Sequence, residues 1–166
     1  MIFVTLGSQK FQFNRLLKAV DHLIEQGKLE DEVFAQIGYS DYRPQYYKFK
    51  QFFDRNGFEE MEENADIVIT HGGTGAIVGA VKKGKKVIAV PRLSEYEEHV
   101  DNHQKQIIKQ FSEMNLIYGV WDCNELEEAL KNIKMHKFDS YKSCTQCYIE
   151  SIEKYIKDES NSRNSK

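Results

Sequence analysis

Short apolar runs alternate along the chain with longer segments in which apolar residues recur every three or four positions. The short runs predict β-strands, and the longer segments predict helices with one apolar face. The predicted strands are Ile2–Leu6, Val33–Ile37, Tyr47–Phe53, Ala65–Thr70, Lys86–Val90 and Leu116–Val120. The predicted helices are Phe13–Gln26, Gly57–Asn64, Thr74–Lys83, His99–Asn115, Asn124–Ile133 and Tyr141–Ile156, with Asn124 as a helix cap.

This alternation predicts a single α/β domain built on a doubly wound parallel sheet, with helices on both faces. A length of 166 residues suits one domain with a substantial core. We assign the domain to residues 1–157 and a polar tail to residues 158–166. In such sheets ligands bind beyond the carboxyl ends of the strands, so the residues that follow each strand are the first candidates for a site.

Composition argues against several classes of function. The net charge of −3 gives no basic excess for binding nucleic acid. No apolar run approaches the roughly 20 residues that span a bilayer, and the start MIFVTLGSQK is typical of a first strand rather than a signal peptide. Cys144 and Cys147 form a lone CxxC without the second pair that completes a zinc site, so we expect no metal.

Two of the predicted strands are followed by glycine-rich turns. Gly7 and Ser8 follow the first strand, and the turn His71-Gly72-Gly73-Thr74-Gly75 joins a strand to a helix. Glycines let a ligand approach the backbone closely, and a helix start favours an anion, most often phosphate. His71 could add a hydrogen-bond donor, or a positive charge if protonated. The alternative is a tight turn without a ligand, because the pattern is neither a P-loop nor GxGxxG.

A third polar group follows the strand that ends before Pro91-Arg92. Asp101, His103 and Gln104 are expected in the first turn of the next helix, at the same edge of the sheet. Such side chains could bind sugar hydroxyls or phosphates. The alternative is a solvated first turn whose acidic residues complement the helix dipole.

These blocks together resemble one family. The stretch ADIVITHGGTGAIVGAVKKGKKVIAVPR, followed by EHVDNHQ, resembles the donor-binding half of GT-B glycosyltransferases, of the glycosyltransferase family 28 C-terminal-domain type. The most similar are small split enzymes: the eukaryotic UDP-GlcNAc transferase subunit of the dolichol pathway, and bacterial capsule and exopolysaccharide transferase subunits. VTLGSQKFQFNRLLKAV also resembles the family's opening, and PRLSEYEEHVDNHQ favours the bacterial branch. The resemblance covers residues 1–135.

The resemblance implies a Rossmann-like fold and a catalytic, donor-binding subunit of a two-component inverting transferase. Such an enzyme moves a sugar from a UDP-sugar to a lipid-linked acceptor in capsule or exopolysaccharide synthesis, without a metal cofactor. The acceptor half would be a separate, membrane-anchored chain that holds this cytoplasmic subunit at the inner face of the membrane. The alternative is a non-catalytic nucleotide-sugar-binding or enhancer subunit. Galactose, glucose, GlcNAc and glucuronate all stay open as the donor sugar.

The resemblance also implies roles for residues at matching positions. Asp101, His103 and Gln104 would contact the donor sugar, with Asp101 a candidate base, although the family usually takes its base from the acceptor half. Many members place at Gly79 a glutamate that binds ribose, and this chain departs from that pattern. The positions expected around the diphosphate are Gly7, Ser8, His71, Gly72, Gly73, Thr74 and Gly75. Arg92, Glu98 and His99 lie in the block typical of the bacterial branch, as supporting residues without assigned roles.

Two segments each have two interpretations. The predicted helix at residues 141–156 either packs on its own domain or reaches the partner chain. The tyrosines of the polar stretch before Lys48 either form an interface, which tyrosine suits, or belong to a loop packed on the sheet. These tyrosines are Tyr39, Tyr42, Tyr46 and Tyr47.

Overall fold

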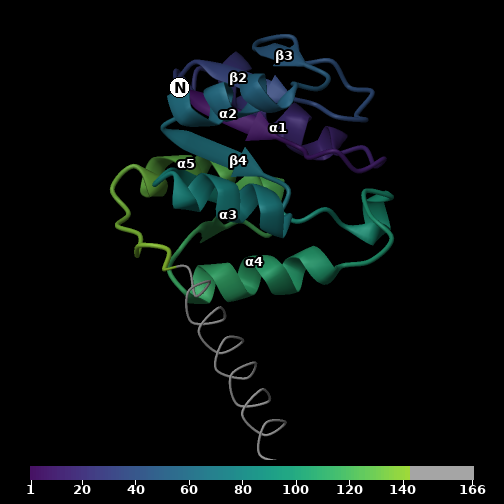
Figure 1. Ribbon diagram of the computed structural model, residues 1–166. Helices are drawn as coiled ribbons and strands as arrows, with labels where there is room; N and C mark the ends of the chain where they lie inside the picture. The colour runs from purple at the N-terminus through teal and green to yellow at the C-terminus, as the bar shows by residue number, and fades with distance from the viewer. Residues whose placement is uncertain (143–166) are drawn as a thin grey trace, which may run out of the picture.

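A six-stranded parallel sheet forms the centre of the protein (Figure 1), which we describe from a computed structural model for residues 1–142. The strand order is β3-β2-β1-β4-β5-β6, so the predicted doubly wound sheet is confirmed. From β1 the chain adds β2 and β3 on one side of the sheet, and β4, β5 and β6 then follow on the other side of β1. Sheets of this kind have a crevice at their carboxyl edge where the order reverses, here between β1 and β4. The strands are β1 (Ile2–Thr5), β2 (Val33–Gln36), β3 (Lys48–Lys50), β4 (Ile67–Thr70), β5 (Lys86–Ala89) and β6 (Tyr118–Gly119).

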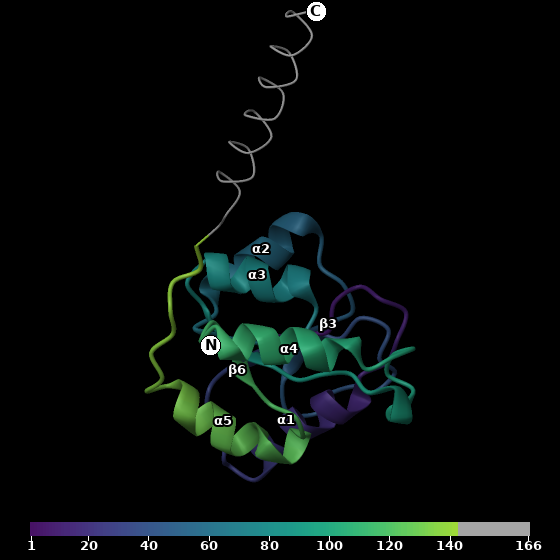
Figure 2. The ribbon, with the colours of Figure 1, turned by 90° about the horizontal axis from the view of Figure 1, so that it is seen from below.

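Helices cover both faces of the sheet, as Figure 2 shows from below. Ile2 and Val4 of β1 pack in the core shared with α1 and α5, whereas Phe3 packs in the core on the side of α2, α3 and α4. This alternation is the period of two expected of a strand buried on both faces. The helices are α1 (Asn14–Glu25), α2 (Arg55–Asn64), α3 (Thr74–Lys82), α4 (His103–Glu113) and α5 (Leu126–Ile133), with short 3₁₀ turns η1 (Ser94–Tyr96) and η2 (Cys123–Glu125).

Several helix starts differ from the prediction, those of α4 and α5 among them. Helix α4 begins at His103 and not at His99, because the Asp101 carboxylate accepts the His103 backbone N–H at 2.9 Å. An aspartate that bonds a first-turn N–H is typical of a helix start. Asn124 does not cap α5 either: it lies inside η2, and Asp122 accepts the Asn124 N–H at 2.8 Å.

The tyrosine-rich loop between β2 and β3 packs on helix α1. The buried Asp21 carboxylate accepts the hydroxyl of Tyr42 at 2.7 Å and the backbone N–H groups of Gln45 and Tyr46 at 2.8 and 2.9 Å. The hydroxyl of Tyr47 donates to the carbonyl of Leu17. The interpretation as a packed loop therefore holds for Tyr42 and Tyr47, with α1 rather than the sheet as the surface.

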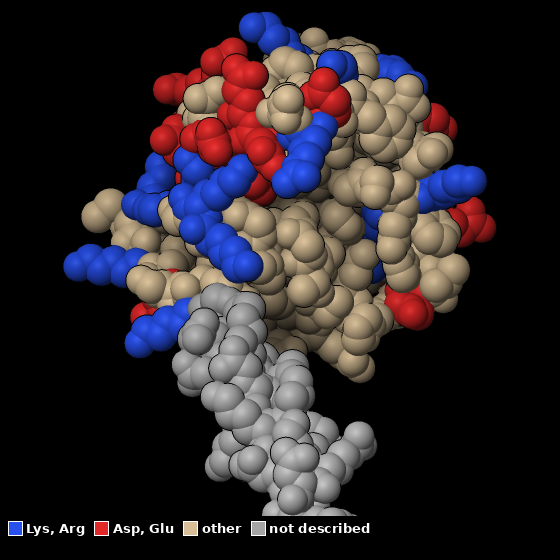
Figure 3. All heavy atoms as spheres, in the orientation of Figure 1, with Lys and Arg blue, Asp and Glu red and all other residues tan. Residues whose placement is uncertain are grey.

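Helices α2 and α3 are joined by a partly buried ion pair. Lys83 Nζ lies 2.9 Å from the Glu62 carboxylate and 3.9 Å from that of Glu63. In Figure 3, acidic side chains gather at the upper left beside a group of basic side chains. Glu62 is only 3% exposed, so the ion pair with Lys83 compensates part of the cost of burying its carboxylate.

Several predictions fall beyond residue 142. Apart from residues 141 and 142, the predicted helix at 141–156 lies outside the described residues, as do the tail at 158–166 and both CxxC cysteines. Within residues 1–142, no helix has the length and apolar character to cross a membrane. The same residues contain no group of three or more side chains placed to hold a metal ion.

Candidate functional site

A cleft of about 360 Å³ opens at the carboxyl edge of the sheet, where β1 and β4 lie side by side. Its walls come from the β1–α1 loop, from the turn after β4 and from the start of α3. The lining residues are Thr5, Gly7, Ser8, Gln9, Gln36, Phe58, His71, Gly73, Gly75 and Ala76. The structure therefore brings the two predicted glycine turns together around one space, although they are far apart in the sequence.

Two glycines make room for the imidazole of His71. A methyl group on Gly7 would lie 2.5 Å from Cε1 of His71, and one on Gly73 would lie 2.6 Å from Nε2. Gly7 also has a φ of +71°, a backbone conformation that favours glycine. The ring is thus held between two backbone segments, and His71 is only 7% exposed.

The turn after β4 leaves the start of α3 open toward the cleft. Gly72 has a φ of +75°, and a methyl group there would lie 2.6 Å from Cδ1 of Ile108 in α4. Gly73 is the N-cap of α3, and within the described residues no side chain caps this helix. A methyl group on Gly75 would meet nothing within 4 Å, so the first turn is accessible. An uncapped helix start with exposed N–H groups favours an anion.

His71 is neutral at physiological pH. Burial, together with the positive charge of Arg92, lowers its pKa to about 4, although a hydrogen bond to the Thr5 backbone acts in the opposite direction. With the pKa so lowered, the neutral ring matches the first of the two roles suggested by the sequence, that of a hydrogen-bond donor.

The β5–α4 loop places its charged residues behind the cleft. Arg92 is fully buried, and its Nη2 donates to the carbonyls of Leu6 at 2.8 Å and Phe11 at 3.2 Å. Glu98, 1% exposed, forms an ion pair at 2.9 Å with Nη2 of Arg15. Arg92 thus holds the β1–α1 loop, and Glu98 ties the β5–α4 loop to α1; these two of the three predicted supporting residues do not line the cleft.

The residues predicted to contact the donor sugar lie around the start of α4, outside the cleft lining. The side chain of Gln104 is buried, and its Oε1 accepts the backbone N–H of Arg92 at 2.9 Å. Asp101 and His103 are exposed. Nε2 of His99 lies 3.1 Å from Oε1 of Gln9, so this histidine links the β5–α4 loop to the β1–α1 loop.

Gln36 and Phe58 line the cleft, but the sequence did not predict them as site residues. Gln36 ends β2, and its Oε1 accepts the backbone N–H of Phe53 at 3.0 Å. A polar residue at the carboxyl end of an apolar strand is the signal that could have identified it. Phe58 comes from α2 and packs edge-on against Phe3 at 5.4 Å, a contact that no local pattern predicts.

Gly79 faces helix α2 rather than the cleft. A methyl group at this position would lie 3.4 Å from Oε1 of Glu62, so the glutamate of α2 occupies the space beside it. No carboxylate is found among the described residues that line the cleft. No acidic side chain inside the cleft therefore takes the place of the glutamate that the resemblance implies at Gly79.

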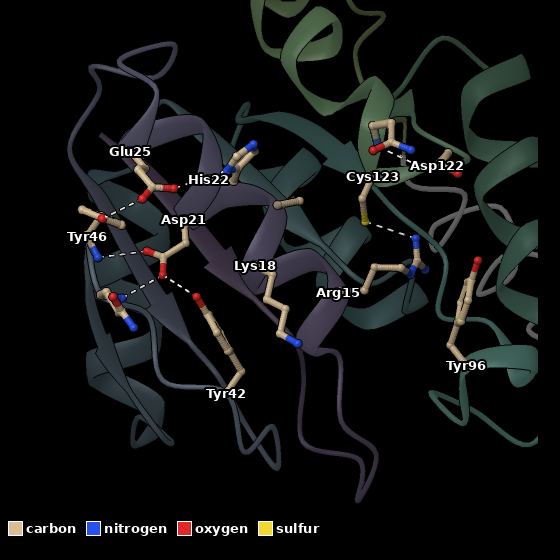
Figure 4. Close-up of a pocket in the computed structure, with 13 residues that line it drawn as sticks. Arg15, Lys18, Asp21, His22, Glu25, Tyr42, Tyr46, Tyr96, Asp122 and Cys123 are labelled. Carbon is tan, nitrogen blue, oxygen red and sulfur yellow. Dashed lines mark hydrogen bonds and ion pairs between the residues drawn. The ribbon is translucent and has the colours of Figure 1, made fainter.

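A larger hollow of about 560 Å³ lies along helix α1, shown in Figure 4. Tyr42 and Asp21 stand on one side of it, and Arg15 and Cys123 stand on the other, joined by a 3.1 Å hydrogen bond. Many of the side chains around this hollow already have partners within the protein, such as Asp21 with Tyr42, and the hollow lies away from the glycine turns. We therefore assign the site to the smaller cleft.

Sequence comparisons identify relatives of this chain. The chain is similar to the UDP-N-acetylglucosamine transferase subunit ALG13 of Candida glabrata, with 32% identity over 108 residues, 64% of this chain and 46% of the relative. It is also similar to the subunit of the same name in Saccharomyces cerevisiae, with 28% identity over 121 residues, 66% of this chain and 56% of the relative. The chain thus spans about half the length of these curated relatives.

Solved structures share the fold. The solution structure of ALG13 superposes with a TM-score of 0.59 at 18% identity, covering 92% of this chain and 94% of that one. The crystal structure of MurG from Acinetobacter baumannii superposes with a TM-score of 0.54 at 18% identity, covering 80% of this chain and 42% of that one. The family model described as the glycosyltransferase family 28 C-terminal domain matches residues 1–159, and the chain belongs to this family.

Proposed function

We propose that this chain is the donor-binding and catalytic subunit of a two-component inverting glycosyltransferase that uses a UDP-sugar. The observation that carries the proposal is the glycine-lined cleft, where His71 and the uncapped start of α3 face the same space. Backbone N–H groups at such a helix start suit the oxygens of a diphosphate. Membership of a glycosyltransferase family supports the same substrate class.

The proposed reaction divides into three tasks. The bond between the anomeric carbon and the diphosphate oxygen breaks, and its electron pair stays on the departing UDP. A new bond forms from the acceptor oxygen to that carbon, while a base takes the proton of the acceptor hydroxyl. Fixed N–H dipoles in the cleft would stabilise the charge that grows on the diphosphate. The proposal requires no metal cofactor.

We place the base on the acceptor half of the enzyme. Asp101 is a poor base, because the N–H of His103 lowers the pKa of its carboxyl and the carboxyl is exposed. Among the described cleft residues there is no carboxylate to replace it. The acceptor half would be a membrane-anchored chain, which would hold this subunit at the cytoplasmic face of the membrane.

The donor and the biological setting rest on likeness alone. The relatives are named as UDP-N-acetylglucosamine transferase subunits, so UDP-GlcNAc is the first donor to test. UDP-galactose, UDP-glucose and UDP-glucuronate follow. The block PRLSEYEEHVDNHQ supports a lipid-linked acceptor in capsule or exopolysaccharide synthesis, because it resembles the bacterial split enzymes.

Calorimetric titration with UDP and the four UDP-sugars tests the site. We expect His71→Ala to weaken UDP binding at least tenfold, whereas His22→Ala, an exposed histidine on α1, leaves it unchanged. Unaltered UDP binding by His71→Ala would show that the diphosphate does not lie in this cleft. Transfer should require the acceptor half, so strong transfer by the isolated chain would refute the division of tasks.

The non-catalytic alternative has one observation in its favour, the absence of any carboxylate among the described cleft residues. Steady-state kinetics of the reconstituted complex separate the two functions. If His71→Ala lowers kcat, the cleft contributes to the transition state. If it raises KM alone, the chain only binds the donor.

A further inference from the structure

The guanidinium of Arg92 is buried with unused hydrogen-bonding capacity. The residue is 0% exposed, and within the described residues its Nε and Nη1 have no partner. Only Nη2 is bonded, to the carbonyls of Leu6 and Phe11. Buried polar groups without partners are rare and costly, so this arginine needs an explanation beyond packing.

The charge around Arg92 is also unbalanced. Glu98 is the nearby carboxylate, and Arg15 binds both of its oxygens, at 3.1 and 2.9 Å. The backbone N–H of Leu93 bonds the same group at 3.0 Å. Two guanidinium groups therefore share one carboxylate, and this trio of Arg15, Glu98 and Arg92 has a net charge of +1. Burial lowers the pKa of Arg92 to about 10, so Arg92 stays protonated at neutral pH.

This charge lies directly behind the cleft. Arg92 holds the back of the β1–α1 loop through Leu6 and Phe11, and the front of the same loop, from Gly7 to Gln9, lines the cleft. The positive charge of Arg92 also acts on the ring of His71, which lines the cleft as well. An anion in the cleft would therefore sit within the field of a buried cation that protein carboxylates only partly neutralise.

We propose that Arg92 is a positioning residue that gives the cleft its preference for a diphosphate over an uncharged nucleoside. This inference rests on the proposed function and adds to it a source of charge that does not touch the ligand. The same field would stabilise the departing UDP, whose diphosphate gains negative charge as the bond to the sugar breaks. The arginine acts through the loop and through space, since it does not line the cleft.

Titrations of the full chain with UDP and with uridine test the inference. For Arg92→Met we expect UDP binding to weaken about tenfold or more, which suits a unit charge acting over several ångströms at an effective dielectric constant of ~20. Uridine binding, followed by NMR, should stay within about twofold. Arg92→Lys should restore most of the UDP affinity. An equal loss for UDP and uridine would mean that Arg92 only supports the fold, and would overturn the inference.

Glu98→Gln supplies a test with the opposite sign. It removes a negative charge from the same trio at nearly constant volume, so UDP binding should tighten about twofold to fivefold. If Glu98→Gln and Arg92→Met both weakened UDP binding, a packing defect would explain the two losses, and a role for charge would be refuted. Circular dichroism would confirm that the variants are folded.

Inorganic pyrophosphate distinguishes this inference from the proposed function. If the wild type binds pyrophosphate in an Arg92-dependent way but binds no UDP, the anion preference stands and the nucleotide-sugar assignment is wrong. If UDP binds but Arg92→Met does not change its affinity, the proposed function stands and this inference fails. If the wild type binds neither, both fail.

Discussion

Acidification should destabilise the protein through His71. In the unfolded chain a histidine has a pKa near 6.5, whereas burial and the charge of Arg92 lower the pKa of His71 to about 4 in the folded protein. Between these two values the unfolded state binds more protons than the native state. Stability is therefore complete above pH 6.5 and falls as the pH drops toward 4.

The magnitude follows from the two pKa values. At pH 5 the unfolded histidine is almost fully protonated and the native one almost fully neutral. Linkage then gives a loss of about 2 kcal/mol relative to pH 7, rising to about 3 kcal/mol below pH 4. This is a substantial part of the roughly 5–15 kcal/mol by which a domain of this kind is stable.

Urea unfolding at pH 7 and pH 5 measures the effect. Other groups also titrate in this range, so the useful quantity is the difference between wild type and His71→Gln, which cannot be protonated. We expect the variant to lose about 2 kcal/mol less than the wild type between the two pH values. His22→Gln, which removes an exposed histidine, should behave like the wild type.

Two results would refute this reasoning. Equal losses of stability in wild type and His71→Gln would show that the ring is not held neutral by its surroundings. A proton NMR titration that placed the pKa of His71 near 6.5 would show the same directly, because burial between Gly7 and Gly73 could not then be excluding the charged form.

Three further predictions concern stability and are measured by urea unfolding at pH 7. Gly7→Ala should lower the free energy of unfolding by at least about 2 kcal/mol more than Gly27→Ala does. Both glycines have a positive φ, but only a methyl group at Gly7 would meet His71. Equal losses in the two variants would contradict the close contact. Lys83→Met should cost about 2 kcal/mol, because it leaves the buried Glu62 unpaired, whereas exposed Lys82→Met should cost about 0.5 kcal/mol or less. Tyr42→Phe should cost about 1 kcal/mol by removing a bond to buried Asp21. In the wild type, a spectroscopic titration should show the Tyr42 phenol ionising only near its raised pKa of about 12, and a phenol that titrates near 10 would show that this bond does not form.

The parallel sheet was predictable from sequence because its signals are local. Strands such as Ile2–Thr5 and Ile67–Thr70 are short apolar runs that end at glycine or histidine turns, and each is followed by a segment of helical period. The rule that ligands bind at the carboxyl ends of strands then brought the two glycine turns to one edge. Both steps use neighbours in sequence and one general property of parallel sheets.

The features of the site that the sequence did not predict depend mostly on contacts between distant segments of the chain. Gln104 has the sequence context of a sugar-binding residue, but its side chain turns inward to bond the backbone of Arg92. Likewise, no local pattern reveals that Glu98 pairs with Arg15, which lies 83 positions earlier in the chain. The start of α4 was predicted too early for a different reason: Asp101 was interpreted as a residue inside the helix, whereas it bonds the first helical N–H.

The charges around the cleft also bear on why such an enzyme would be divided into two chains. On the proposed function, the cleft combines N–H dipoles, a neutral His71 that can donate a hydrogen bond, and the buried trio of net charge +1 behind it, and these groups favour an anionic ligand. A carboxylate base placed in this cleft would repel the diphosphate, and its own pKa would be lowered by the same field, which would weaken it as a base. A base carried by the acceptor half avoids both effects, because it reaches the anomeric carbon only when the acceptor is bound. On the proposed function, donor binding and proton removal are therefore separated for an electrostatic reason.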